Sequence, residues 1–105
     1  MINLFLLLSA VTSTVLLADV TMYGKTGFPM ANGEYPYPGA VATSDRAIPF
    51  GTIVLINNKR YVVKDRTAKW VHQKFGQTFD IYSEDSHKEM LRFGRQKKKV
   101  IVLSR

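Results

Sequence analysis

Three aspartates stand beside apolar stretches whose composition predicts β-strands. Asp80 lies inside Thr78–Tyr82, Asp65 follows Tyr61–Val63, and Asp45 precedes Ile48–Thr52. A carboxyl among apolar residues is costly to ionise, and neighbouring carboxyls raise the pKa of at least one member of the group. A carboxylic acid that stays protonated near neutral pH can donate a proton to a leaving glycosidic oxygen. The structural alternative is that Asp80 alternates outward on a half-exposed strand and that Asp65 begins a turn.

These carboxyls need elements that bring them together, and the pattern of the chain predicts a small all-β domain. Glycines and prolines mark 24–39 as a loop, Asn57-Asn58 as a hairpin turn, and 66–77 as polar and irregular. A helix is expected over Ser86–Phe93, ended by Gly94. Six short strands without a βαβ rhythm favour a closed six-stranded barrel with this one helix near the C-terminus. The expected strands are 19–23, 40–42, 51–56, 60–64, 79–82 and 99–103.

Length and composition restrict the function. A chain of 105 residues has room for one domain, and 46% hydrophobic residues argue against disorder along its whole length. The absence of cysteine excludes disulfides, a cysteine nucleophile and thiolate zinc sites. A net charge of +7 favours an anionic partner, such as an acidic polymer, a membrane surface or nucleic acid.

The first 18 residues differ from the rest because they hold no charged side chain. They predict a secretory signal peptide over 1–18, cleaved after Ala18, and a mature domain over 19–105. An uncleaved membrane anchor and a buried first strand or helix are the alternatives. Export favours a partner outside the cytoplasm, with the protein secreted, periplasmic or in the cell wall, and it disfavours nucleic acid.

Four segments in order resemble the three-aspartate (3D) domain family, over roughly 19–103. They are Val41–Thr52 (VATSDRAIPFGT), Val62–Arg66 (VVKDR), Phe79–Tyr82 (FDIY), and Arg92–Arg95 (RFGR) followed by Lys99–Val102. The resemblance implies a double-psi β-barrel that acts on the cell wall, similar to the catalytic barrels of lytic transglycosylases and to rare lipoprotein A. Such enzymes cleave peptidoglycan glycan strands without water, as lyases, and leave a 1,6-anhydro end.

Carried over to this chain, the resemblance implies that Asp80 is the general acid and base. It also implies that Asp65 adjusts the pKa of Asp80 and holds its geometry. Asp45 stands one place after the family's first aspartate, where this chain has Ser44. We expect no cofactor and no metal, and a monomer that acts on peptidoglycan, with membrane contact only through an uncleaved N-terminal segment. Candidate substrate-binding residues are Tyr23, Thr52, Lys69 and Trp70.

Each of these residues also has a structural interpretation. Tyr23 and Trp70 can pack on the barrel, and His72 and His87 are most simply surface residues. Two other functions stay open from the sequence. One is a non-catalytic cell-wall-binding barrel, and the other is a basic nucleic-acid-binding β-barrel.

Overall fold

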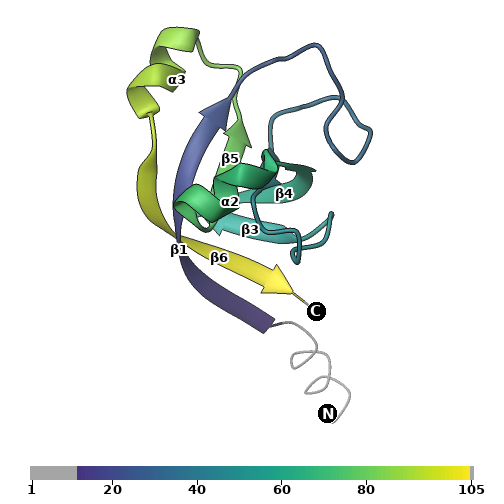
Figure 1. Cartoon of the computed structure of the whole chain (residues 1–105), viewed down its shortest axis with the longest axis vertical. Coiled ribbons are helices and arrows are strands. Elements are labelled where there is room, and N and C mark those ends of the chain that lie inside the picture. The colour runs from purple at the N-terminus through teal and green to yellow at the C-terminus, as the bar shows by residue number, and fades with distance from the viewer. Residues whose placement is uncertain (1–11, 105) are drawn as a thin grey trace.

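The computed structural model describes residues 12–104, which form six strands and two short helices. In chain order they are β1 (Thr12–Tyr23), β2 (Ala40–Thr43), β3 (Ile53–Ile56), β4 (Lys59–Arg66), α2 (Lys69–Phe75), β5 (Thr78–Tyr82), α3 (His87–Phe93) and β6 (Gln96–Ser104). The predicted mainly β fold with a helix near the C-terminus is confirmed (Figure 1).

The strands close into a barrel in the order β1-β5-β2-β4-β3-β6. The β1–β5 and β2–β4 pairs are parallel, and the four other pairs are antiparallel. This mixed order is compatible with a double-psi barrel. Closure gives every strand two neighbouring strands, so a small domain gains a compact core.

The core lies inside the barrel because apolar side chains alternate along its strands. Val54 and Ile56 on β3, and Val100 and Val102 on β6, point inward while their neighbours are more exposed. On β5 the inward residues are Phe79 and Ile81, which places Asp80 between them on the other face of the strand. The inner cluster consists of Ala18, Val20, Val41, Ile48, Val54, Ile56, Val63, Phe79, Ile81, Val100 and Val102.

The β3–β4 hairpin forms where the sequence predicts it. Asn57 and Asn58 both have positive φ, 53° and 64°, and join Ile56 to its partner Lys59. Two left-handed residues make the turn whose twist suits a two-residue hairpin, and asparagine tolerates that conformation better than most residues.

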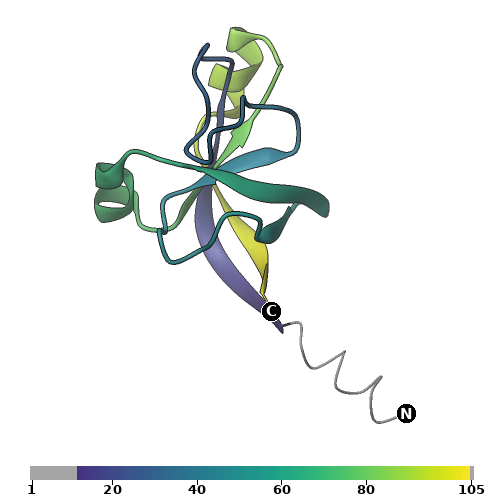
Figure 2. The same ribbon diagram turned by 90° about the vertical axis from the view of Figure 1, so that its right-hand side faces the viewer.

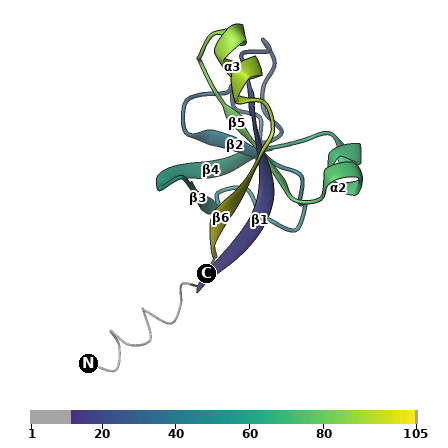
Figure 3. The ribbon, with the colours of Figure 1, turned by 90° about the vertical axis from the view of Figure 1, so that its left-hand side faces the viewer.

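The two helices differ in how well the sequence marks them. The Ser86 side chain accepts a hydrogen bond from the Glu89 N–H, and Gly94, with φ of 62°, ends α3 as predicted. Helix α2 lies in 66–77, where we expected irregular structure. Its N-cap, Ala68, makes no side-chain cap and its first turn holds no acidic residue, so the usual start signals are missing. Burial of Val71 against the barrel holds it instead. Figure 2 and Figure 3 show α2 standing out from the side of the barrel and α3 at one end.

Strand β1 begins earlier than the expected 19–23. Thr12 to Val20 pair antiparallel with Ser104 to Gln96 of β6, and Ala18 is fully buried. The second half of the apolar N-terminal segment therefore contributes to the barrel wall here, while residues 1–11 lie outside the described residues. Cleavage after Ala18 stays a prediction. Within 12–104, no helix is long and apolar enough to cross a membrane.

Candidate active site

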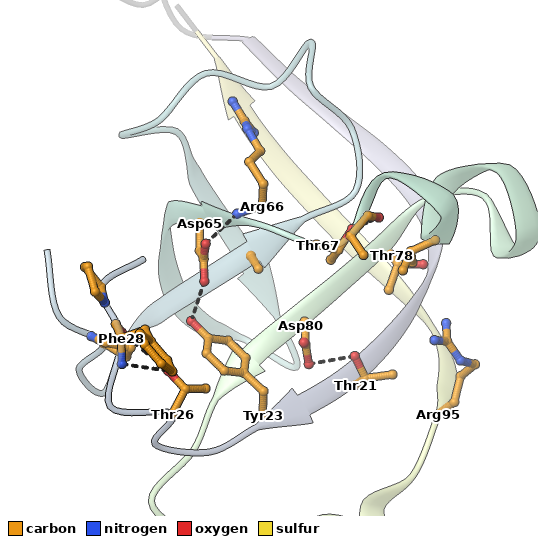
Figure 4. A pocket seen from close by; sticks show the side chains of 15 residues that line it. Thr21, Tyr23, Thr26, Phe28, Asp65, Arg66, Thr67, Thr78, Asp80 and Arg95 are labelled. Carbon is orange, nitrogen blue, oxygen red and sulfur yellow. Dashed lines mark hydrogen bonds between the residues drawn. The ribbon is translucent and has the colours of Figure 1, made fainter. Parts of the chain in front are cut away.

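A cavity of about 290 Å³ opens on the outer face of four adjacent strands, β1, β5, β2 and β4 (Figure 4). The loop between β1 and β2 and the segment before α2 complete its walls. It contains both of the carboxyls to which the sequence gives the main roles. The lining residues are Thr21, Tyr23, Thr26, Phe28, Pro29, Pro36, Ala42, Asp65, Arg66, Thr67, Ala68, Val71, Thr78, Asp80 and Arg95.

Asp80 faces this cavity because its neighbours in β5 face the core. Its register partners are Thr21 on β1 and Ala42 on β2, and the small Ala42 side chain leaves space beside the carboxyl. The Thr21 hydroxyl donates a hydrogen bond of 2.8 Å to Asp80 Oδ1. The outward alternation considered from the sequence is therefore found, but it leads into a walled cavity and not onto an open surface.

Burial raises the pKa of Asp80 above its ordinary value, and the negative charge of Asp65 adds to the rise. The hydrogen bond from Thr21 and the positive charge of Arg95 act in the opposite direction, because both favour the ionised form. The net effect is a carboxyl that holds its proton to higher pH than a surface aspartate. This is the property that a general acid requires.

Asp65 reaches the same cavity through an irregularity in β4. Val63 points into the core, so strict alternation would turn Asp65 inward as well. The register of β2 on β4 shifts instead, from Val41↔Val63 to Ala42↔Asp65, which places an extra residue on β4. Such a bulge re-aims the side chains that follow it, and here it brings Asp65 to the outer face.

The Asp65 carboxylate is held in place by three hydrogen bonds. Oδ1 accepts from the backbone N–H groups of Ala31 and Arg66, each at 2.8 Å, and Oδ2 accepts from the Tyr23 hydroxyl at 3.2 Å. The bond from Ala31 fastens the β1–β2 loop to β4. Asp65 therefore supplies a fixed acceptor and a fixed negative charge, and it also orders the loop that walls the cavity.

Tyr23 lies between the two carboxyls in Figure 4. Burial, followed by the nearby charge of Asp65, raises the pKa of its hydroxyl, so the group stays a neutral donor at physiological pH. Its ring meets the Tyr82 ring edge to face, with centroids 5.6 Å apart. The ring therefore packs on the barrel, and Tyr23 also lines the cavity, while its contact with a substrate stays a prediction.

Asp45 does not line this cavity. Its carboxylate accepts hydrogen bonds from Gln77 Nε2 at 2.7 Å and from the Ala47 N–H at 2.9 Å, and it faces a second cavity of about 270 Å³. The Gln77 bond is the main cause that lowers the pKa of Asp45. Ser44, at the family's usual aspartate position, is buried and accepts a hydrogen bond from the Thr78 N–H. Two of the three aspartates, Asp65 and Asp80, therefore line one cavity, and Asp45 lines another.

The remaining predicted binding residues also lie outside the Asp65–Asp80 cavity. Thr52 lines the second cavity with Asp45. Lys69 and Trp70 begin α2, and the Trp70 ring, 57% exposed, lies 6.3 Å from the ring of Phe75. His72 is exposed, but its Nδ1 lies 2.9 Å from Ser44 Oγ, so it is more than a solvated surface residue.

Four of the lining residues that had no role in the sequence-based site, Thr21, Phe28, Arg66 and Arg95, bring polar, aromatic or charged groups to the cavity. Thr21 shares a strand face with Tyr23, so the two-residue period could have revealed it. Phe28 is 73% exposed on the cavity wall, and Arg66 and Arg95 bring positive charge to it. The Arg66 guanidinium lies 4.4 Å from the Phe50 ring centroid, and in Figure 4 it points away from the carboxyls.

Metal chemistry has no evident donor set among residues 12–104, since no group of three histidine, aspartate or glutamate side chains there could hold an ion. Comparison of the chain with protein-family models, with curated proteins and with solved structures gives no match.

Proposed function

We propose that this protein is an exported enzyme that cleaves the glycan strands of peptidoglycan, as a lytic transglycosylase of the three-aspartate type. The observation that carries the proposal is the pair of carboxyls in one cavity. Asp80 has a pKa raised by burial, and Asp65 is fixed beside it by three hydrogen bonds. Two carboxyls with different environments are the arrangement that glycoside cleavage uses.

In the proposed reaction, protonated Asp80 donates its proton to the glycosidic oxygen while positive charge develops at the neighbouring sugar carbon. The C6 hydroxyl of the same sugar attacks that carbon, and the Asp80 carboxylate accepts the hydroxyl proton. The bond to the leaving sugar breaks, a 1,6-anhydro ring forms, and Asp80 is protonated again. The step needs no water, metal or enzyme nucleophile.

Asp65 and Tyr23 support this step without transferring a proton. The negative charge of Asp65 raises the pKa of Asp80 and favours positive charge on the sugar. Tyr23, whose pKa is raised, donates to Asp65 and keeps its carboxylate oriented. Loss of either residue is expected to change the acidity of Asp80 and not only the shape of the cavity.

Location and partner follow from the remaining features. The uncharged N-terminal segment favours export to the periplasm, the cell wall or the medium. All charged residues lie in 19–105, so that part carries the whole +7 and suits a negatively charged wall polymer. The resemblance to the three-aspartate family agrees with this assignment, and two of its segments, around Asp65 and Asp80, include the two cavity carboxyls.

The test is digestion of purified peptidoglycan sacculi by the full chain, with products identified by mass spectrometry. We expect 1,6-anhydro-muramyl ends, and their loss in Asp80→Asn. Asp85→Asn is the matched control, because Asp85 is exposed and lies outside the cavity. If Asp80→Asn still produces anhydro ends, Asp80 is not the general acid of the reaction.

A non-catalytic wall-binding barrel is the second candidate, favoured by one observation. Asp65 accepts three hydrogen bonds from groups within the protein, and Asp45 lines another cavity. Binding to sacculi without any new ends, unchanged by Asp80→Asn, would support this function over the enzyme.

A further inference from the structure

Arg95 lies at one end of the Asp65–Asp80 cavity and is held there from two sides. Its Nη1 donates a hydrogen bond of 3.0 Å to Asp19 Oδ2, and its guanidinium carbon lies 3.8 Å from the centroid of the Phe75 ring. Aromatic stacking and an ion pair together fix the plane of a guanidinium. In Figure 4, Thr21 lies between Arg95 and Asp80.

The positive charge of Arg95 at this end of the cavity is only partly neutralised by Asp19, its buried ion-pair partner. Asp19 is only 6% exposed, and its carboxylate also accepts an ion pair from Lys97 at 2.8 Å. The single Asp19 carboxylate thus forms ion pairs with both Arg95 and Lys97, so this group of three side chains has a net charge of +1. Lys97 is not among the residues that line the cavity, whereas Arg95 is.

The Arg95 guanidinium also has hydrogen-bonding capacity to spare. It carries five N–H donors in a planar fork that matches a carboxylate. Within residues 12–104 the structure gives this side chain a single hydrogen bond, the one to Asp19. A pre-positioned cation with unused donors on a cavity wall is suited to binding an anionic group of whatever occupies the cavity.

We propose that Arg95 is a specificity-determining residue that binds a carboxylate carried by the sugar next to the bond to be cleaved. The site would then select glycan strands in which the lactyl group of N-acetylmuramic acid is a free carboxylate, as after removal of the stem peptides, over strands in which that group is amide-bonded to a peptide. The inference rests on the proposed function, because it takes a glycan as the occupant of the cavity.

Binding of such a carboxylate would act on Asp80 as well. The positive charge of Arg95 opposes the protonation of Asp80, because it favours the ionised form. A substrate carboxylate on Arg95 neutralises that charge and adds a negative one nearby, so Asp80 holds its proton more firmly when the acidic sugar is present. Recognition and general acid catalysis would thereby be coupled through Arg95.

The test compares three ligands by NMR titration of the full-length Asp80→Asn protein, which cannot turn them over. They are the N-acetylglucosamine–N-acetylmuramic acid disaccharide, the same disaccharide with its lactyl carboxylate converted to an amide, and chitobiose. We expect the acid to bind about tenfold more tightly than the amide, a difference of about 1.4 kcal/mol. We expect Arg95→Gln to abolish the preference and Arg95→Lys to keep part of it.

The matched control is Arg92→Gln, which removes the same charge three residues away. Arg92 is exposed, ion-pairs with Glu89 and lies outside the cavity, so the preference should persist. Equal binding of acid and amide would overturn the proposal while leaving a glycan-cleaving enzyme intact. Failure of all three ligands to bind would overturn the proposed function too. If Arg95→Gln does not fold, the ratio of the affinities for the acid and the amide, measured in the protein that retains Arg95, tests whether the site prefers a carboxylate.

Discussion

The Thr21 hydroxyl and the Asp80 carboxyl meet across the parallel β1–β5 pair, with Oγ1 donating to Oδ1 at 2.8 Å. This bond opposes the effect of burial on Asp80, because it stabilises the ionised form. A residue on another strand thus moderates the rise that burial causes in the pKa of the proposed general acid.

Thr21→Val removes that hydrogen bond with little change in size, so it should raise the pKa of Asp80 further. Asp80 must be protonated to act as the acid, and activity falls as pH rises through its pKa. The alkaline limb of the pH–activity profile should therefore move to higher pH. Thr52→Val, which changes the second cavity, should leave the limb where it is. If the alkaline limb of the pH–activity profile does not move in Thr21→Val, the hydrogen bond from Thr21 does not affect the pKa of the catalytic acid.

Asp65→Ala tests the structural part of the site. It removes the acceptor of the exposed Ala31 N–H and of the half-buried Tyr23 hydroxyl, and a hydrogen bond of this kind contributes about 0.5–1.5 kcal/mol to stability. We expect a loss of stability of that order in denaturant unfolding, with faster amide exchange at Ala31. Asp85→Ala, at an exposed position, is the control. Unchanged exchange at Ala31 would show that Asp65 does not anchor the loop.

The start of the folded domain can be tested by truncation. A chain that begins at Asp19 loses the pairs from Thr12 to Ala18 with β6, the buried Ala18, and Leu16, which packs on the core. We expect it to be less stable than a chain that begins at Thr12, by about 2 kcal/mol or more in denaturant unfolding. Equal stability would mean that cleavage after Ala18 costs the barrel nothing.

Phe28 and Trp70 compete as the aromatic platform for a sugar. Phe28 is exposed on the cavity wall, whereas Trp70 is exposed in the first turn of α2, where its ring lies near that of Phe75. Phe28→Ala should weaken glycan binding by about 2- to 10-fold, the usual range for an aromatic contact, and Trp70→Ala should have a smaller effect. Binding measured by NMR titration with the disaccharide compares them. A larger loss in Trp70→Ala would favour the residue chosen from the sequence.

The sequence predicts the features that depend on local chemistry. Asn57-Asn58 marks the hairpin, Ser86 and Gly94 delimit α3, and apolar runs locate five strands closely. Helix α2 is not predictable in this way, because it has no cap and is held by burial of Val71 on the barrel. The early start of β1 depends on pairing with β6, which lies at the other end of the chain.

The same division applies to the candidate site. Asp80 could be singled out because a carboxyl in an apolar strand is unusual, and the motif segments add Asp65. The separate position of Asp45 could not be foreseen, since Gln77, its hydrogen-bond partner, lies 32 residues away. Arg95 is positioned by Asp19, 76 residues distant, so its place in the cavity appears only in the folded chain.

The central claim is that Asp80 is the proton donor. The direct measurement is the titration of its side-chain carboxyl by NMR in the unliganded full chain, set beside the alkaline limb of kcat/KM for release of anhydro-muramyl ends. The limb of kcat/KM reports the free enzyme's essential acid. We predict a pKa above that of an ordinary aspartate that coincides with the limb. A pKa of Asp80 at or below the ordinary value, or a limb that titrates elsewhere, would contradict the account.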